Sequence, residues 1–395
     1  MSDLRIGIVG AGPGGLTAAI TARRLGLDVE VFEQAPRFAR IGGPIGIQSN
    51  GLQVLDLLGL LARAALVVQH EAVLESPPGR VLMHADFRAI DLPHAGYAAM
   101  LRCDLQELLV AALREVGAEI HHDARCTGVT PRDDGAELRF AGGEVRSFDA
   151  VIAFDGIRSA VRDSLGFDVH RRAVGEAYLR LVSGRAAEPS QVGEFWGRDG
   201  RRLGIFPLPE HRTYMFCSVP IGEWDAIREH RLRPWISSWG EFGGHAAALL
   251  DDVDWSGAVY DELTDLRVAS WHRGAVFLAG DAAHAMTPNL GQGANSAMVD
   301  GVVLARLLAE ARTERGALAR VGARYEAIRR PFVTRLQDAA LHGGWMASFR
   351  SPVARWARDH ALRLSQTIGA ARLASLRLIA GWNPAEQDLL RGTLG

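Results

Sequence analysis

The stretch from Gly274 to Asp300, GAVFLAGDAAHAMTPNLGQGANSAMVD, predicts a buried strand, a sharp turn that carries an acid, a loop and the start of a helix. Ala275 to Ala279 is a short apolar run bounded by glycines, which is typical of a strand covered on both faces. Asp281 follows this run outside the carboxyl end of the strand, where parallel sheets bind their ligands. An acid at that position is placed to hold a hydroxyl group.

The loop after Asp281 favours a flat ligand that carries negative charge. Residues Pro288 to Gly293 cannot continue a strand or a helix, and the glycines Gly291 and Gly293 let main-chain N–H groups approach a ligand closely. A helix is expected from about Ala294, and its unpaired N–H groups favour negative charge in front of them. The alternative is a plain strand, loop and helix in which Asp281 only aids solubility.

The first residues contain a glycine-rich turn in the context that dinucleotide binding requires. An apolar strand, Arg5 to Val9, precedes Gly10-Ala-Gly12-Pro-Gly14-Gly15, and a helical pattern from Leu16 to Leu25 follows it. A second strand, Asp28 to Phe32, ends in Glu33, about twenty residues further on, where an acid holds ribose hydroxyls. The strand, the helix and the acid all stand where a dinucleotide-binding motif requires them. This favours a dinucleotide site over a glycine-rich turn without a ligand.

Local patterns also predict the elements that lie between and after these motifs. They indicate a glycine-rich loop at Ile41–Gln48, helices at Asn50–Leu58 and Leu101–Val116, and a hairpin turn at Pro77–Gly79. A small meander is expected from short strands at Glu119–His121, Thr127–Thr130 and Ala136–Phe140. A further buried strand, Phe148–Phe154, ends in Asp155-Gly156, and Val169–Pro220 predicts strands of a separate sheet.

Composition limits the function classes that remain. A chain of 395 residues with 48% hydrophobic residues is long enough for two lobes with sizeable cores. The net charge of −2 gives no basic field, so no nucleic-acid partner is expected. The chain has no lysine, which excludes Schiff-base chemistry, and Cys103, Cys126 and Cys217 indicate neither a disulfide framework nor a metal site. No signal sequence and no apolar stretch of membrane-spanning length is present, so we expect a cytoplasmic protein.

Four motifs together resemble the FAD-dependent aromatic hydroxylase family, the single-component flavoprotein monooxygenases. They are GAGPGG with Glu33, Arg102 in LRCDLQELL, DGIRSAVR from Asp155, and GDAAHAMTPNLGQGAN from Gly280. The resemblance spans most of the chain. Within this family, the chain is similar to the alkylquinolone 3-hydroxylases and to related salicylate-hydroxylase-like enzymes. The similarity lies in GEFWGRDGRRLG, ASWHRG and the Trp/Arg-rich tail.

The resemblance implies an α/β fold with a Rossmann-like FAD-binding domain, an interleaved and mostly antiparallel substrate sheet, and C-terminal helices. The expected FAD-binding domain is discontinuous and comprises residues 1–72, 98–168 and 270–340. Residues 73–97 and 169–269 would form the substrate-binding sheet domain, and residues 341–395 the C-terminal helices.

The resemblance also implies the residues that hold the cofactor. The glycine-rich turn and Glu33 would bind the ADP half, Arg102 would lie near the diphosphate and ribityl chain, and Asp281 would bind the ribityl hydroxyls. Asp155-Gly156 would serve both FAD and the nicotinamide donor, although Phe154 replaces the small residue that usually precedes this pair. The full expected set is Gly10, Gly12, Pro13, Gly14, Gly15, Glu33, Gln34, Ile47, Arg102, Cys126, Asp155, Gly156, Asp281, Pro288, Gly291, Gly293, Ala294 and Asn295.

Substrate and acid–base residues are less defined by these motifs. His284 is expected to pack beside the flavin rather than to transfer protons. Arg202 and Tyr214 fall where some members bind polar substrate groups, or they are ordinary alternating sheet residues. Asn289 and Gly46 stand where the urate and hydroxynicotinate enzymes carry an acid and a histidine base, which argues against those two substrates. No catalytic base and no metal ligand is identified.

The implied reaction is hydroxylation of a small aromatic or heteroaromatic substrate, phenol- or quinolone-like, through a flavin C4a-hydroperoxide. Its cofactor would be non-covalent FAD, with NADH or NADPH as transient electron donor and O2 as co-substrate. The alternatives are a flavin epoxidase or a non-oxygenating FAD oxidoreductase on the same fold, and a non-catalytic binding protein. The substrate, the choice between NADH and NADPH, and the oligomeric state stay open.

The tail predicts basic amphipathic helices, in which apolar residues between Val353 and Leu378 alternate with arginines. One interpretation docks the apolar faces on the protein and leaves the arginines in solvent. The other is a surface element in weak contact with a membrane, which admits a lipophilic substrate.

Overall fold

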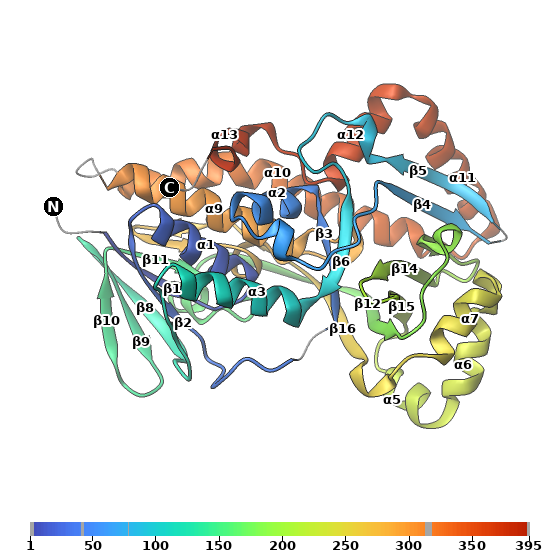
Figure 1. Cartoon of the computed structure of the whole chain (residues 1–395), viewed down its shortest axis with the longest axis horizontal. Helices are drawn as coiled ribbons and strands as arrows, with labels where there is room; N and C mark the ends of the chain where they lie inside the picture. Colours follow the sequence, from blue (N-terminus) through green and yellow to red (C-terminus); the bar gives the residue numbers. More distant parts are fainter. Residues whose placement is uncertain (1–3, 41–42, 78, 313–317, 393–395) are drawn as a thin grey trace.

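The computed structural model describes residues 4–40, 43–77, 79–312 and 318–392. Figure 1 shows an elongated molecule with one large sheet in each half and with helices from the C-terminal part of the chain along one side. The expected mixed α/β architecture with C-terminal helices is confirmed.

A six-stranded sheet forms one half of the molecule, in the order β17-β18-β11-β1-β2-β7. Its inner strands are parallel, and β11 and β18 are buried along their whole length, which explains their uninterrupted apolar sequences. Helices α1 (Pro13–Arg24) and α9 (Gly293–Ala311) pack against each other beside it. The strands are β1 (Arg5–Val9), β2 (Asp28–Phe32), β7 (Ile120–His121), β11 (Ala150–Ala153), β17 (His272–Arg273) and β18 (Val276–Leu278).

A seven-stranded, mainly antiparallel sheet forms the other half, in the order β16-β12-β15-β14-β13-β4-β5. One face carries a compact apolar core that includes Leu203, Met215 and Trp239. That core packs under α5 (Trp224–Ala226), α6 (Leu232–Ser238) and α7 (Gly244–Asp251), as the lower right of Figure 1 shows. The strands are β4 (Glu71–Ser76), β5 (Arg80–Asp86), β12 (Val169–Ser183), β13 (Gly193–Trp196), β14 (Arg202–Leu208), β15 (Arg212–Val219) and β16 (Val259–Val268).

Two small sheets and the remaining helices complete the fold. A three-stranded sheet has the order β10-β9-β8, and β3 pairs with β6 in a two-stranded sheet. These strands are β3 (Pro44–Gln48), β6 (Tyr97–Leu101), β8 (Cys126–Arg132), β9 (Gly135–Phe140) and β10 (Val145–Phe148). The other helices are α2 (Ser49–Leu57), α3 (Arg102–Glu115), α4 (Ala160–Ser164), α8 (Asp281–His284), α10 (Leu318–Ala347), α11 (Pro352–Thr367), α12 (Gly369–Ile379) and α13 (Gln387–Leu390).

Three predicted elements differ from the structure. Residues 44–48 form strand β3 rather than a loop, because pairing with β6 compensates for the weak strand preference of Gly46. Ile41 and Gly42 of that predicted loop lie outside the described residues. The strand expected at Glu119–His121 joins the six-stranded sheet through β2 and is not part of the meander.

The strand expected at Phe148–Phe154 is interrupted at Asp149. Phe148 ends β10 in the small sheet, and Ala150 begins β11 in the six-stranded sheet. The carboxylate of Asp149 accepts the main-chain N–H of Arg5 at 2.7 Å, which fixes the change of direction. An apolar pattern that continues through one acid does not reveal this change of sheet. The hairpin expected around Pro77–Gly79 is confirmed by the antiparallel pairing of β4 and β5, although Pro78 lies outside the described residues.

Candidate cofactor and substrate site

The first glycine-rich turn combines close packing with open space. Gly10 has φ +100°, and a Cβ there would lie 2.4 Å from the carbonyl oxygen of Phe154. A Cβ on Gly15 would lie 2.0 Å from the carbonyl oxygen of Gly10, so both positions require glycine. A Cβ on Gly12, at the start of α1, would by contrast meet no other part of the protein within 4 Å. The helix N-terminus is therefore open to an anionic group such as a diphosphate.

Phe154, the unusual residue before Asp155, fits because its neighbour lacks a side chain. A Cβ on Gly14 would lie 2.5 Å from Cε1 of the Phe154 ring. The ring thus occupies the space beside Gly14, and Pro13 begins α1 next to it. Packing before the Asp155-Gly156 pair therefore depends on the glycine-rich turn.

Glu33 ties the end of β2 to this turn. Its carboxylate accepts the main-chain N–H of Ala11 at 3.0 Å and that of Ala35 at 2.9 Å. Each carboxylate oxygen keeps a second lone pair, so these bonds leave acceptor capacity for ribose hydroxyls. Gln34, the next predicted residue, is exposed.

Asp281 and Arg102 come together from distant parts of the chain. Asp281 begins α8, and Arg102 begins α3. Burial among protein atoms raises the pKa of Asp281, while the charges of His284 and Arg102 act in the opposite direction. The side chain of Asp281 is nevertheless exposed. The carboxylate is therefore accessible to solvent although many protein atoms surround it. This combination is expected of a side chain in the wall of a ligand site.

The loop after α8 closes on strand β3. Asn295 is completely buried, and its amide donates to the carbonyl oxygens of Gly46 at 3.0 Å and Gly291 at 2.7 Å. Its Oδ1 accepts the main-chain N–H of Gln48 at 3.2 Å. Gly291 adopts the left-handed conformation at φ +63°. These bonds bring the 44–48 and 288–295 segments to one place.

The start of α9 is the second open helix N-terminus of the site. The helix begins at Gly293, one residue before the expected position. A Cβ on Gly293 would meet no other part of the protein within 4 Å. Pro288 is exposed, and Gly293 and Ala294 are half-buried. The main-chain N–H groups of the first turn therefore face accessible space and favour negative charge there.

Asp155 and Cys126 lie near each other. The carboxylate of Asp155 accepts the main-chain N–H of Val161 at 3.1 Å, while its Oδ1 atom is buried without a partner in the described part of the chain. Burial raises the pKa of the Cys126 thiol to about 11, and the charge of Asp155 contributes. Gly156 has φ +78° and open space at its Cβ position. Ile47 differs from this group because its side chain is fully buried, which leaves only its main chain for a ligand.

Arg202 is buried and already bonded, whereas Tyr214 is half-exposed. The guanidinium donates to Glu194 at 2.8 Å and to Oδ1 of Asn289 at 2.5 Å, and it also contacts the hydroxyl of Tyr178. That hydroxyl donates to the same oxygen of Asn289 at 2.9 Å. Sequence patterns did not identify Tyr178 or Glu194, because their partners come from other strands and from the 288–290 turn.

A buried ionic network behind the site was also missed. Nε2 of His284 lies 2.6 Å from Asp300, and Nε of Arg329 lies 2.7 Å from the other oxygen of Asp300. Burial alone would raise the pKa of Asp300, but His284 and Arg329 lower it to about 2. Arg329 also binds Glu386, near the end of the chain. The ring of His284 also packs against Trp271, with the two ring centres 4.8 Å apart.

The residues present fit FAD. The helices α1 and α9 both present open N-termini, at which a Cβ on Gly12 or Gly293 would meet no other part of the protein within 4 Å. The carboxylate of Asp281 is accessible and lies near the positive charge of Arg102. Together these groups provide contacts for a dinucleotide with a flat ring. Among the described residues, no cluster of three or more His, Cys, Asp or Glu side chains could hold a metal ion. In the same part of the chain, no helix has the length and apolar character that crossing a bilayer requires.

Residues 3–340 match the family described as FAD binding domain, and the chain belongs to this family. The chain is 32% identical over 386 residues to the 2-heptyl-3-hydroxy-4(1H)-quinolone synthase of Pseudomonas aeruginosa, with 95% of this chain and 97% of that protein covered. It is 28% identical over 375 residues to the aurachin C monooxygenase/isomerase of Stigmatella aurantiaca, with 92% and 94% covered. A crystal structure of 2-methyl-3-hydroxypyridine-5-carboxylic acid oxygenase superposes with a TM-score of 0.77 at 26% identity, covering 95% of this chain and 97% of the other.

These findings confirm the class of enzyme that the motifs indicate. The chain is an FAD-dependent monooxygenase of the aromatic hydroxylase type, with NAD(P)H and O2 as co-substrates.

Proposed function

We propose that the chain hydroxylates a neutral aromatic or heteroaromatic ring, phenol- or quinolone-like, that lies against one face of the seven-stranded sheet. The observation that carries this proposal is an aromatic sheet face on which Arg180 and Arg202 are each already paired with an acid. Bound FAD would supply the redox chemistry, by accepting hydride from NADH or NADPH and reacting with O2.

Aromatic side chains alternate along β14 and β15 and share this face. Phe206 pairs with Tyr214 across the two strands, their rings are 5.5 Å apart, and Phe216 lies 6.2 Å from Phe206. All three rings are half-buried. A Cβ on Gly204 would lie 2.1 Å from the Phe216 ring, so the glycine lets this ring lie flat over the strand. Such rings favour stacking with a planar substrate.

The charged groups on this face compensate one another. Arg202 binds Glu194, and Nε of Arg180 donates to Asp261 at 2.9 Å. Glu176 adds a further carboxylate, 3.5 Å from the hydroxyl of Tyr178. A carboxylate substrate would have to break one of these pairs to find a cation, and leaving a partly buried charge unpaired is costly. A neutral ring meets no such cost.

Asn289 links the aromatic face to the cofactor loop. It belongs to the Pro288–Leu290 turn, and its side chain contacts Arg202 and Tyr178 from the sheet. Its amide nitrogen also donates to the carbonyl oxygen of Ala340 at 2.7 Å. A ring held on the sheet face would therefore lie next to the loop that approaches the flavin. This chain's part is to orient that ring, to exclude water, and to stabilise negative charge in front of α9.

We further propose the residue roles and the domain division given by the motifs. The eighteen predicted cofactor residues would hold FAD, with Asp281 and Arg102 near its centre. Residues 1–72, 98–168 and 270–340 would form the FAD-binding domain, residues 73–97 and 169–269 the substrate sheet domain, and residues 341–395 the C-terminal helices. The position of β4 and β5 in the same sheet as β12 to β16 supports this division, although β4 begins at Glu71.

We propose that the protein acts in the cytoplasm and that its C-terminal helices touch a membrane surface there. Three buried free cysteines support a reducing compartment.

A matched pair of substrates tests the neutral-ring proposal. The holoenzyme is titrated with 2-methyl-4-quinolone and with 4-hydroxyquinoline-2-carboxylate, which differ mainly in charge, and binding is followed by the flavin absorbance change. NAD(P)H oxidation is measured with each compound. We expect the neutral ring to bind at least about tenfold more tightly and to accelerate NAD(P)H oxidation more. Tighter binding of the carboxylate would contradict the proposal.

A further inference from the structure

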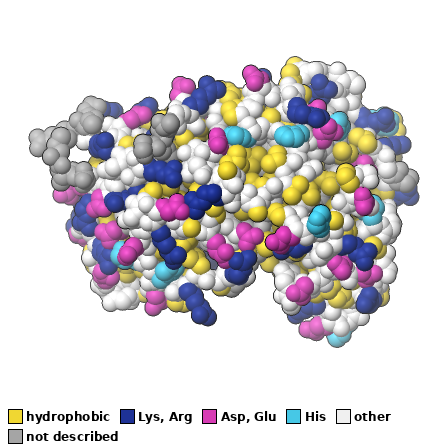
Figure 2. Space-filling view, in the orientation of Figure 1, with side chains coloured by type: hydrophobic (Ala, Val, Ile, Leu, Met, Phe, Trp, Pro, Cys, Tyr) yellow, Lys and Arg dark blue, Asp and Glu magenta, His cyan; other side chains and the backbone are white. Residues whose placement is uncertain are grey.

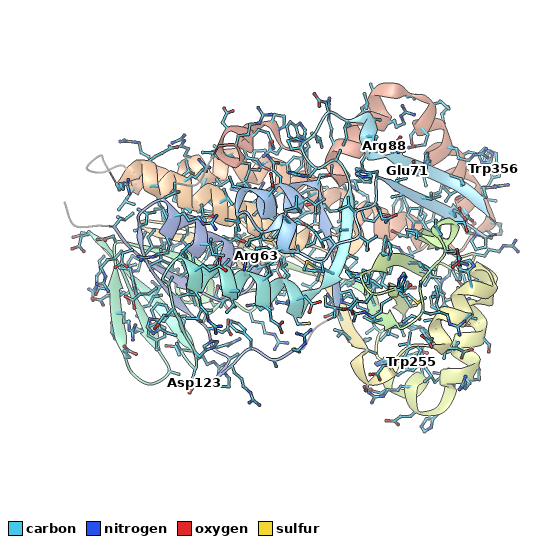
Figure 3. All side chains as sticks on the ribbon, viewed as in Figure 1. Arg63, Glu71, Arg88, Asp123, Trp255 and Trp356 are labelled. Carbon is cyan, nitrogen blue, oxygen red and sulfur yellow. The ribbon has the colours of Figure 1, made fainter. Side chains whose placement is uncertain are left out.

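Helix α11 exposes most of its large apolar residues and buries charged ones. The exposed residues form what we call the α11 stripe, namely Val353, Trp356, Leu364 and Ile368, whose side chains are 75%, 60%, 63% and 52% exposed. Val353, Trp356 and Leu364 lie on one face of α11, and Ile368 follows its last residue directly. Figure 3 shows Trp356 at the outer edge of the molecule. Docking of the apolar face on the protein, one of the two sequence interpretations, is therefore wrong for α11, although Leu376 of α12 is buried in that manner.

The opposite face of α11 is anchored, which fixes the stripe on the outside. Arg358 and Asp359 are buried and paired at 2.7 Å, and the guanidinium of Arg358 lies 5.1 Å from the centre of the Trp196 ring. Arg358 also donates to the carbonyl oxygen of Met346 at 3.1 Å. Rotating the helix to bury the stripe would break these contacts and expose an ion pair without any replacement partner.

The surroundings of the stripe are strongly basic. Residues 343–380 contain six arginines and a single acid, Asp359, which Arg358 already binds. Arg350, Arg363 and Arg377 are exposed. Figure 2 shows basic side chains at the right margin of the molecule, where α11 lies in Figure 1. This local excess of positive charge contrasts with the net charge of −2 for the whole chain.

A groove of about 240 Å³ lies beside the stripe, between β5 and the helices α11 and α12. Arg363 and Arg372 line it, together with Gln366, over apolar side chains that include Val81 and Met83. Neither guanidinium has a hydrogen bond or an ion pair with another described residue. His84, also in the lining, is held by Glu71 at 3.0 Å, and Glu71 also binds Arg88 (Figure 3). The groove thus presents two free guanidinium groups above an apolar floor.

We propose that the α11 stripe and this groove dock on the surface of an anionic phospholipid bilayer. Headgroup phosphates would bind Arg363 and Arg372, and the stripe would enter the boundary between headgroups and acyl chains. A tryptophan and aliphatic residues on one helix face, flanked by arginines, have the composition of helices that lie in this boundary. A second copy of the chain fits less well, since a symmetric contact would bring two positively charged surfaces together.

Co-sedimentation of the holoenzyme with vesicles tests this docking surface. Vesicles of phosphatidylcholine alone are compared with vesicles that also contain phosphatidylglycerol, at low and high salt. We expect binding to the anionic vesicles only, and its loss at high salt. Arg363→Gln and Arg372→Gln should each weaken binding roughly fivefold. Trp356→Asp and Leu364→Asp should abolish binding but leave FAD content and helical circular dichroism unchanged, because both side chains are exposed.

Val145→Asp is the matched control, since Val145 is 52% exposed on β10, at the opposite end of the molecule (Figure 1). It should bind vesicles as the unchanged protein does. Three results would overturn the proposal. They are no binding to anionic vesicles, equal binding to neutral ones, and a stripe that instead mediates self-association, seen as dimers in sedimentation velocity that Leu364→Asp dissociates.

Discussion

Asp281 combines an exposed side chain with a protein environment dense enough to raise its pKa. A hydroxyl of the cofactor would supply the hydrogen bonds that this carboxylate lacks in the protein. We predict that Asp281→Asn weakens FAD binding on the order of tenfold, because the amide oxygen still accepts a hydrogen bond but the negative charge that strengthens this bond is lost. Titration of the apoprotein with FAD, followed by fluorescence quenching, measures this change.

Asp133→Asn provides the control, since Asp133 is an exposed acid in the turn between β8 and β9. Its FAD affinity should equal that of the unchanged protein. If Asp281→Asn bound FAD as tightly as this control, Asp281 would not belong to the site.

Sequence patterns singled out those candidate site residues that belong to a local motif. Gly12, Glu33 and Asp281 stand at fixed positions relative to a strand end, so local patterns sufficed. Arg329 contacts Asp300 across 29 residues and Glu386 across 57, and such contacts have no local pattern. Arg202 illustrates the same limit, because its bonds to Glu194 and Asn289 depend on how the sheet meets the cofactor loop.

The crossing of α1 and α9 positions the N-termini of both helices, where we propose that the cofactor binds. A Cβ on Gly301 would lie 2.7 Å from the carbonyl oxygen of Gly14 and 2.8 Å from the nitrogen of Ala18. We predict that Gly301→Ala separates the helices and lowers the free energy of unfolding by roughly 1 to 3 kcal/mol. Thermal unfolding of the holoenzyme measures this effect, together with the FAD content of the purified variant.

Gly343→Ala, inside α10, is the control for helix propensity, because a Cβ there would meet nothing within 4 Å. It should keep or slightly raise the melting temperature. A melting temperature for Gly301→Ala as high as that of Gly343→Ala would show that the crossing tolerates a side chain.

Element types followed from periodicity, but their orientation and pairing did not. Strands β1, β2 and β18 and helices α1 and α3 appear where the apolar patterns indicate them. Strand β3 forms only because β6 pairs with it, and β10 and β11 separate at Asp149. The amphipathic pattern of α11 was visible in the sequence. Which face is buried depends on Trp196 and Met346, which lie outside the helix.

The whole molecule places a cofactor surface and an aromatic sheet face on either side of the 288–290 turn. The two sheets, each with its own core, meet there through Asn289, which contacts the buried Arg202 and Tyr178. The C-terminal chain supports this junction, since Glu386 binds the arginine that holds Asp300. Family membership indicated both halves in advance. The charge balance of the sheet face became visible only in the folded structure.

Labelling with heavy oxygen tests the central claim, that this chain inserts one atom of O2 into a neutral aromatic ring. The holoenzyme is supplied with NAD(P)H, 2-methyl-4-quinolone or a related neutral ring, and ¹⁸O2 in ordinary water, and the product is analysed by mass spectrometry. The account predicts a product that carries one heavy oxygen atom. A product whose added oxygen comes from water, or NAD(P)H oxidation that yields only peroxide with every neutral ring, would contradict it.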